Sequence, residues 1–274
     1  MTFFNKKTIL GVIVTLAAIV LAGTLFIGWN RLQSQKNYET LAALRAETLT
    51  NDGLAEDGLS NDGLPEEDTT QWEVDTSATQ VQETTTAEYT YKPNNSKKWL
   101  AMNPDYFGWI RVPGTNIDYP FVRSHDNKDY LTLDFNGNYS DAGTLFMDYR
   151  NLGNFNDKHT IIYGHYMKNK TLFHNLTNYH QEAYFEQNQT IELSGLYETK
   201  TYQIVSVYEI SVDDYAFTLA FDDTAAYAQY LQEIIELSLH TRDFDVDPTR
   251  NLLTLVTCSY GVNNGRTIIH AIEQ

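Results

Sequence analysis

Residues 252–258 read LLTLVTC, a run of apolar and β-branched residues that ends at the single cysteine of the chain. Such residues favour a β-strand, and the Ser-Tyr-Gly that follows them favours a turn. A second run of this kind, residues 266–271, begins after a short loop. Because two antiparallel strands joined by a short loop bring their facing ends together, we expect Cys258 and Arg266 to flank the same loop on neighbouring strands.

Short strand-like runs, separated by Gly and Asn clusters, recur through the second two thirds of the chain. They cover residues 107–112, 143–148, 160–163, 190–197, 201–210, 252–257 and 266–272. This many short strands with turn signals predicts a β-barrel or a sandwich. Residues 222–240 differ, because they open with Asp-Asp-Thr and space apolar residues three or four apart, which predicts an amphipathic helix inserted among the strands. A shorter helix is expected over 95–102.

The N-terminal run 8–29 contains no charged residue. At ~1.5 Å rise per residue it is long enough to cross a hydrocarbon core of ~30 Å. It is also longer than the apolar core of a signal peptide, which is ~7–15 residues, and this favours an uncleaved membrane anchor over a cleaved signal peptide. Basic residues stand on both sides of the run, so the positive-inside rule does not decide its orientation.

The segment after the apolar run is strongly acidic. Residues 31–47 space their leucines as a helix does and predict a juxtamembrane helix. Residues 38–90 hold thirteen acidic residues against one basic residue, and Asp-Gly-Leu recurs three times at a five-residue period. Because such a stretch cannot build a core, we expect 48–90 to be a disordered stalk. A calcium-binding interpretation of the repeat lacks the 12-residue loop and terminal Glu of a known site.

These patterns divide the chain into three parts. We expect a membrane anchor at 1–30, a juxtamembrane helix with an acidic stalk at 31–92, and one globular domain at 93–274. The net charge of −17 and the absence of a basic stripe argue against a nucleic-acid partner.

A lone cysteine at a strand end can act as a nucleophile if a base lies within hydrogen-bond reach. Among the seven histidines, His165 is the best placed, because it also follows a strand-like run. Arg266 would stabilise negative charge on a carbonyl oxygen that Cys258 attacks. The alternatives are a buried structural cysteine, a surface histidine and a rim arginine. No histidine pair has the spacing of a helical metal site and no second cysteine exists, so we predict neither a metal site nor a cofactor.

Together these motifs resemble those of sortases. Residues 254–258, TLVTC, match the family's TLxTC signature, and residues 163–165, YGH, resemble its histidine motif. The order His165, Cys258, Arg266 is also that of sortases and differs from papain-like enzymes, in which the cysteine comes first. The chain is similar to class B sortases in the stretches NPDYFGWI (103–110), PGTNIDYP (113–120) and GTLFMDYRN (143–151), and the resemblance covers about 97–272.

The resemblance implies a mainly β fold, a closed eight-stranded barrel with the inserted amphipathic helix and the short N-terminal helix, preceded by a transmembrane helix. It also implies a membrane-anchored cysteine transpeptidase on the outer surface of a Gram-positive cell. Cys258 would attack a threonine carbonyl in a C-terminal sorting signal of the NPxTx type, with His165 as acid and base and Arg266 as oxyanion stabiliser. An amine on a peptidoglycan precursor would then resolve the thioacyl-enzyme and anchor the surface protein to the cell wall.

The resemblance also indicates which residues bind the sorting signal. These are Asn127, Leu131, Tyr163, Val256 and Thr257. The segment around 215–219 and the inserted helix are expected to form a further wall of the groove.

Two features depart from class B. Val256 stands where members often carry serine, and the loop 259–265 contains no acidic residue. Three alternatives stay open: a pilin polymerase that uses lysine amines as acceptors, a hydrolytic protease, and a non-catalytic surface binding module. The absence of an Asp-Pro-aromatic lid before the barrel favours wall anchoring over pilus assembly, and the presence of a complete Cys, His and Arg set argues against the binding module.

Overall fold

A computed structural model describes residues 6–55, 96–153, 157–211, 217–240, 242, 244, 246–258 and 265–274. For residues 6–13, 31, 49–55 and 258 it describes the backbone only. Most of the expected acidic stalk, residues 56–92, and most of the loop after Cys258 lie outside the described residues.

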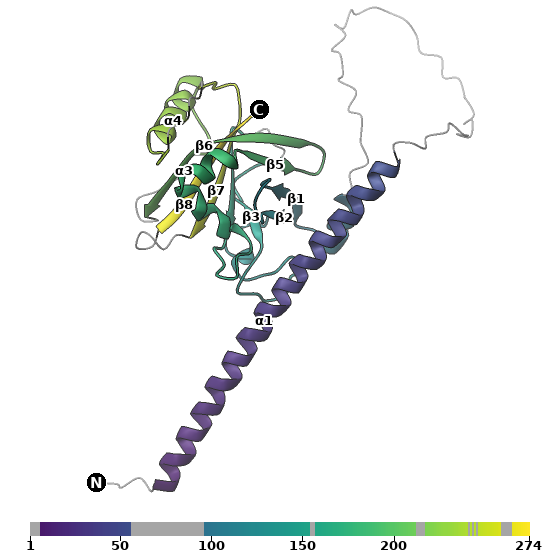
Figure 1. Cartoon of the computed structure of the whole chain (residues 1–274), viewed down its shortest axis with the longest axis vertical. Helices are drawn as coiled ribbons and strands as arrows, with labels where there is room; N and C mark the ends of the chain where they lie inside the picture. Colours follow the sequence, from purple (N-terminus) through teal and green to yellow (C-terminus); the bar gives the residue numbers. More distant parts are fainter. Residues whose placement is uncertain are drawn as a thin grey trace, which may run out of the picture.

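Eight strands form a closed barrel in the order β1-β2-β3-β4-β7-β8-β6-β5. Figure 1 shows the barrel domain beside the long helix α1. Their bounds are β1 Tyr106–Arg111, β2 Asp118–Val122, β3 Leu145–Met147, β4 His159–Gly164, β5 Thr190–Ser194, β6 Thr199–Ser211, β7 Leu252–Cys258 and β8 Gly265–Glu273. Two pairings are parallel, β2 with β3 and β4 with β7, and the others are antiparallel. The closed eight-stranded barrel is therefore confirmed, although β2 was not among the predicted runs.

The helices of the barrel domain were predicted in part. Helix α2 (Ser96–Met102) is present as expected, and α4 (Thr224–Glu236) lies between β6 and β7 in the chain. The side chain of Asp223 accepts a hydrogen bond from the Ala226 amide and so caps the first turn of α4. Helix α4 ends at Glu236, four residues before the predicted end. Three short elements were not predicted: η1 (Asp129–Leu131), η2 (Phe173–His180) and α3 (Glu182–Gln187).

Strand β7 is buried on both faces, which explains why its sequence is apolar almost throughout. Leu253 and Leu255 belong to the main core cluster inside the barrel. Val256 packs instead in a second cluster with Ile161, Tyr208 and Ile268, against which Phe217 and Leu219 also pack. The segment that leads into α4 therefore covers the outer face of β4, β7 and β8.

The N-terminal segment forms one continuous helix, α1 (Lys6–Ala55). Its described residues 14–30 are exposed or nearly so, and this apolar part projects away from the barrel in Figure 1. By length and composition it is a helix that could cross a membrane. The helix continues past the predicted end at 47, so the expectation of disorder from residue 48 is wrong for residues 48–55.

The second half of α1 docks on the barrel. Tyr38 and Leu41 are buried and belong to the main core cluster. Ser34 and Ser140 share a hydrogen bond of 2.5 Å, and the Arg45 guanidinium lies 4.4 Å from the ring centre of Trp109. The juxtamembrane helix is therefore part of the barrel's core rather than a separate rod.

Candidate active site

The register of three neighbouring strands brings together the backbones of the three predicted catalytic residues. Cys258 pairs with Arg266 across the antiparallel β7–β8 ladder. On the other side of β7, Gly164 pairs with Thr257 in the parallel β4–β7 ladder, and His165 follows Gly164 directly. Because adjacent strands lie ~4.8 Å apart, positions 165, 258 and 266 meet at one end of the barrel. The expectation that Cys258 and Arg266 lie on neighbouring strands beside one loop is confirmed.

His165 is held at the end of β4 by its neighbours. Its Nε2–H donates to the Leu131 carbonyl oxygen at 2.8 Å, which ties the ring to the end of η1. Gly164 allows a close approach, because an added Cβ would lie 2.3 Å from Leu145 Cδ2 and 2.7 Å from Phe173 Cδ2. These contacts fix the backbone from which the imidazole projects.

Arg266 begins β8 beside the end of β7. Its side chain is half-buried, and Nη1 donates to the Gly265 carbonyl oxygen at 3.0 Å. The guanidinium keeps further N–H donors, since it carries five. A planar cation at this position suits the stabilisation of an oxyanion that forms beside position 258.

Tyr163 and Asn127 meet at a buried carboxylate that sequence reasoning did not single out. Asp148 accepts hydrogen bonds from the Tyr163 hydroxyl at 2.9 Å and from Asn127 Nδ2 at 3.1 Å. Arg150 adds a two-point contact with the same carboxylate, at 2.9 and 2.8 Å. Asn127 Oδ1 in turn accepts from the Tyr149 amide, so both amide atoms of Asn127 serve the protein's own structure. The hydrogen bonds to Asp148 therefore join the loop before η1, the end of β3 and strand β4.

The charge of Asp148 is stabilised by these donors. Burial by itself would raise the pKa of this carboxyl, but the hydrogen bonds from Arg150 and Tyr163 hold its pKa below the usual value. Burial and the Asp148 charge together raise the pKa of Tyr163, so this phenol stays protonated and keeps donating.

We expect Asp148→Ala to lower the free energy of unfolding by about 3 kcal/mol, because it removes a buried carboxylate and leaves the Tyr163 hydroxyl and the Asn127 amide without their acceptor. The Arg150 side chain is 43% exposed, so loss of its ion pair adds little to this cost. Urea unfolding followed by circular dichroism measures this change. Glu192→Ala is the control, since it breaks the exposed Arg111–Glu192 pair and should cost below about 1 kcal/mol. An equal cost for both variants would contradict the role given to the buried carboxylate.

Of the remaining predicted substrate-binding residues, Leu131 ends η1, and Val256 and Thr257 lie in β7. Leu131 is 38% exposed beside His165, and Val256 is buried under Phe217 and Leu219. Thr257 is buried, and its hydroxyl oxygen has no hydrogen-bond partner among the residues that the structure describes. Residues 215 and 216 of the expected wall lie outside the described residues, whereas Phe217 and Leu219 do cover the face beside Tyr163.

A buried hydrogen-bond chain anchors this covering segment. The Tyr208 hydroxyl donates to His270 Nε2 at 2.8 Å, and His270 Nδ1–H donates to Thr254 Oγ1 at 2.7 Å. Thr254 then donates to His159 Nε2 at 2.6 Å, and His159 Nδ1–H donates to the Thr218 carbonyl oxygen at 2.6 Å. This order of donors requires both imidazoles to be neutral. Sequence analysis did not single out either histidine, because β4 and β6 are distant in the chain from β7 and β8.

Acid should therefore destabilise the fold through this chain. Burial lowers the pKa of His159 to about 4 and that of His270 well below its usual value, so both stay neutral in the folded protein. As the pH falls below ~6.5, the unfolded chain takes up protons that the folded one refuses, and stability falls until about pH 4 for His159. We expect His159 to account for a loss of about 2 kcal/mol between pH 7 and pH 5.

Urea unfolding at several pH values tests this expectation. His159→Gln should flatten the fall in stability between pH 7 and pH 5, whereas His125→Gln, at a histidine whose side chain is 84% exposed, should leave it unchanged. An unchanged slope in His159→Gln would contradict the neutral-histidine chain.

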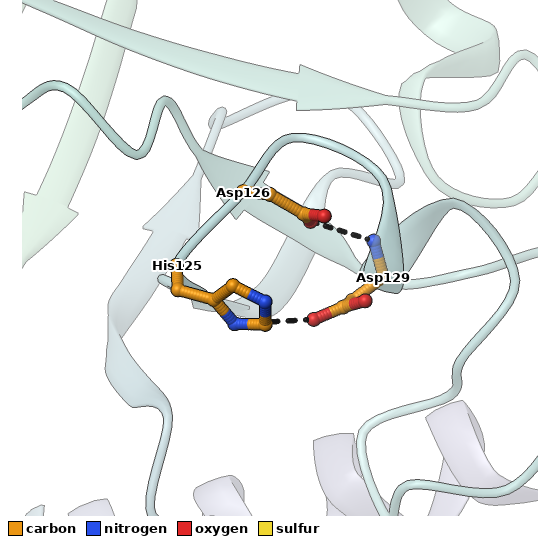
Figure 2. Close-up of side chains that lie close together, drawn as sticks. All are labelled: His125, Asp126 and Asp129. Carbon is orange, nitrogen blue, oxygen red and sulfur yellow. Dashed lines mark hydrogen bonds and ion pairs between the residues drawn. The ribbon is translucent and has the colours of Figure 1, made fainter.

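One cluster among the described residues has the composition of a metal site. His125, Asp126 and Asp129 bring their ligand atoms within 4.8 Å of one another beside η1, as Figure 2 shows. Asp126 Oδ1 is already engaged, because it accepts from the Lys128 and Asp129 amides at 2.8 and 3.1 Å. Asp129 accepts from the Ser124 hydroxyl at 2.7 Å. These bonds engage both carboxylates in the turn that leads into η1.

Comparison with known proteins agrees with this geometry. The sortase-domain family model matches residues 110–274. Sortase B of Listeria monocytogenes is 34% identical over 157 residues, which are 57% of this chain and 64% of that protein, so the match spans just under two thirds of that relative. Sortase B of Staphylococcus aureus is 33% identical over 173 residues, 62% of this chain and 70% of that protein. The X-ray structure of Clostridium perfringens sortase B is 36% identical with a TM-score of 0.63, and the match covers 65% of this chain and 99% of that one. The chain therefore belongs to the sortase family and, within it, to class B.

Proposed function

We propose that this chain is a membrane-anchored cysteine transpeptidase that joins surface proteins to an amine of a cell-wall precursor. The observation that carries the proposal is the meeting of positions 165, 258 and 266 at one end of β4, β7 and β8. Membership of class B supports the same reaction. The apolar part of α1 supports a membrane anchor, because it is long and apolar enough to cross a membrane. We propose a single-pass topology with the barrel outside the cell, as the family resemblance implies.

In the first half-reaction the Cys258 thiolate attacks the carbonyl carbon of the scissile peptide bond in the sorting signal. Arg266 stabilises the oxyanion, and His165 gives a proton to the departing amine, leaving a thioester on Cys258. In the second half-reaction an acceptor amine attacks the thioester carbonyl, the C–N bond forms and the C–S bond breaks. The amine proton passes to His165 and the sulfur leaves as thiolate, so the enzyme returns to its starting state.

The outer face of β4 and β7 is the proposed binding surface for the sorting signal. Phe217 packs beside Tyr163 and Val256 and forms one side of the proposed groove, and Leu131 borders the groove next to His165. We propose that the signal is of the NPxTx type and is cut after its threonine. Asn127 contributes by holding Asp148 and Tyr163 in position rather than through a free amide.

The three parts expected from sequence remain our proposal for the organisation of the chain, with one change. Because Tyr38 and Leu41 of α1 complete the barrel's core, the working unit includes residues 34–45 as well as residues 93–274. Experiments should therefore use the full chain in detergent or vesicles.

The test incubates the full chain with peptides that carry NPxTx, LPxTG or pilin-type signals, together with an amine acceptor, and identifies the products by mass spectrometry. Cleavage after threonine with a new amide to the acceptor is the expected result on the NPxTx peptide. Transfer to a lysine side chain in preference to a glycine amine would indicate pilin polymerisation, and cleavage without transfer would indicate a protease. Absence of cleavage on every peptide would contradict the proposal.

A further inference from the structure

A cavity of about 520 Å³ lies between helix α1 and the segment that follows β4. One wall is made by Gly28, Leu32 and Gln35 of α1, which succeed one another along a single helix face. The other wall is made by His165, Tyr166, Met167, Lys168 and Asn169, and Asp141 also lines the cavity. A volume of this size accommodates a small organic ligand.

The walls of this cavity are held in fixed positions. The hydrogen bonds Ser34–Ser140 and Asn37–Asp134 fasten α1 to the loop before β3, and the Tyr38 hydroxyl donates to the Gly143 carbonyl oxygen. On the opposite wall, Phe173 N–H donates to the His165 carbonyl oxygen at 3.2 Å. The space is thus formed before any ligand arrives.

The position of the cavity along α1 sets it at the membrane surface. The charge-free run ends at Trp29, an exposed aromatic residue of the type that sits at lipid headgroups. From Gly28 to Gln35 the helix rises ~10 Å, enough to pass through a headgroup layer of ~5–8 Å on one side of the bilayer. A molecule anchored in the lipid would reach this cavity without leaving the membrane.

The chemistry of the lining matches a charged amphiphile that carries an amine. Asp141 offers a carboxylate for an ammonium group, Lys168 offers a cation for a lipid phosphate, and Gln35 and Asn169 offer amide groups. Leu32 and Met167 supply apolar surface. The ring of His165 belongs to the same lining, and an amine that is to attack the thioester must give its proton to this group.

We propose that this cavity is the entry site for the acceptor, a primary amine carried on a membrane lipid, and that α1 is thus a substrate-binding element as well as an anchor. The inference rests on the proposed transpeptidase function and assigns a binding site to the second substrate. The sorting signal occupies the face of Tyr163 and Val256, and the amine reaches His165 from the side of α1. The bond made is the amide between the acyl carbon and the amine nitrogen, and the bond broken is the C–S bond of the thioester. The amine proton passes to His165, and the sulfur leaves as thiolate.

Two glycines of α1 provide a matched test. A Cβ added at Gly28 or at Gly23 would meet no atom within 4 Å, so a larger side chain fits the helix at either position. Gly28 lines the cavity and Gly23 does not. Gly28→Phe should fill part of the space, whereas Gly23→Phe should only add an apolar side chain to the exposed, membrane-facing part of the helix.

The full chain is reconstituted in vesicles with a signal peptide and either of two acceptors, triglycine linked to phosphatidylethanolamine or soluble triglycine. The measured quantity is the ratio of transferred to hydrolysed product. For Gly28→Phe we expect this ratio to fall at least tenfold with the lipid-linked amine and much less with the soluble one, and for Gly23→Phe we expect no change. Lys168→Glu, at an exposed position that tolerates substitution, should raise the KM for the lipid-linked amine, and Lys97→Glu on α2 should not.

Each other outcome overturns the assignment. An unchanged ratio in Gly28→Phe means that the acceptor does not enter here. If Gly28→Phe lowers the transfer-to-hydrolysis ratio equally with both acceptors, the substitution disturbs His165 instead. If Gly23→Phe lowers the ratio as much as Gly28→Phe does, the cause is a changed position of the helix in the membrane. Absence of any transfer by the unchanged protein would instead overturn the proposed function itself.

Discussion

Replacing Cys258 by alanine should abolish both cleavage of the sorting signal and transfer to the amine, by about 10⁵-fold or more. The cysteine is the single thiol of the chain, so no second sulfur can form the thioester. Without a nucleophile, Arg266 and the binding groove have no tetrahedral intermediate to stabilise. Product formation measured by mass spectrometry over hours gives the required range.

The control for this loss is the fold of the variant. Cys258 ends β7 and pairs with Arg266, so a disturbed strand would show in circular dichroism and in the urea midpoint. We expect both to stay close to those of the unchanged protein, because alanine removes one small atom at a strand end. Residual transfer by a folded Cys258→Ala protein at one hundredth of the normal rate would mean that another residue is the nucleophile.

Arg266→Lys should lower kcat by about 10²–10³-fold while KM for the sorting signal changes little. Lysine keeps the positive charge but loses the planar set of N–H donors that can serve the Gly265 carbonyl oxygen and an oxyanion together. Because an oxyanion exists in the transition state and not in the bound signal, the loss should fall on kcat.

Arg111→Lys is the matched control for this substitution. Arg111 lies in β1 and pairs with Glu192 at 3.2 Å on the exposed surface. The kcat of the Arg111→Lys protein should therefore equal that of the unchanged protein. A loss in Arg266→Lys that appears only in KM would assign Arg266 to binding of the signal. A loss of the same size in both variants would indicate a general effect of replacing arginine.

Most strands of the barrel could be predicted from local sequence, and the elements that were missed have physical reasons. Strand β7 was predictable because its residues favour strands throughout, and the cap of α4 because Asp223 stands directly before it. Strand β2 was missed because Pro120 lies inside it and lacks the N–H that a strand interior needs. The continuation of α1 to Ala55 was missed because the acidic Asp-Gly-Leu repeat favours disorder when read alone.

The sequence predicted the juxtaposition of site residues only where a short loop connects their strands, as it does for Cys258 and Arg266. His165 could be singled out because it follows a strand-like run, but no local rule showed that its strand lies beside that of Cys258. Asp148 was quoted within a family stretch, but its role depends on Tyr163 and Asn127, which fold back on it from other segments. The cavity beside His165 forms because α1 packs against the barrel. The sequence of the helix does not predict which surface of the barrel it packs against, so the cavity could not be predicted.

The central claim, that Cys258 carries the acyl group between two substrates, is tested most directly by the mass of the intact protein. The full chain is mixed with an NPxTx peptide in the absence of amine, acid-quenched after short times and weighed by mass spectrometry. The account predicts a new species heavier by the acyl part of the peptide, absent in Cys258→Ala and discharged into an amide product when an amine is added. Cleavage of the peptide without such a species, or a species that persists in Cys258→Ala, would contradict it.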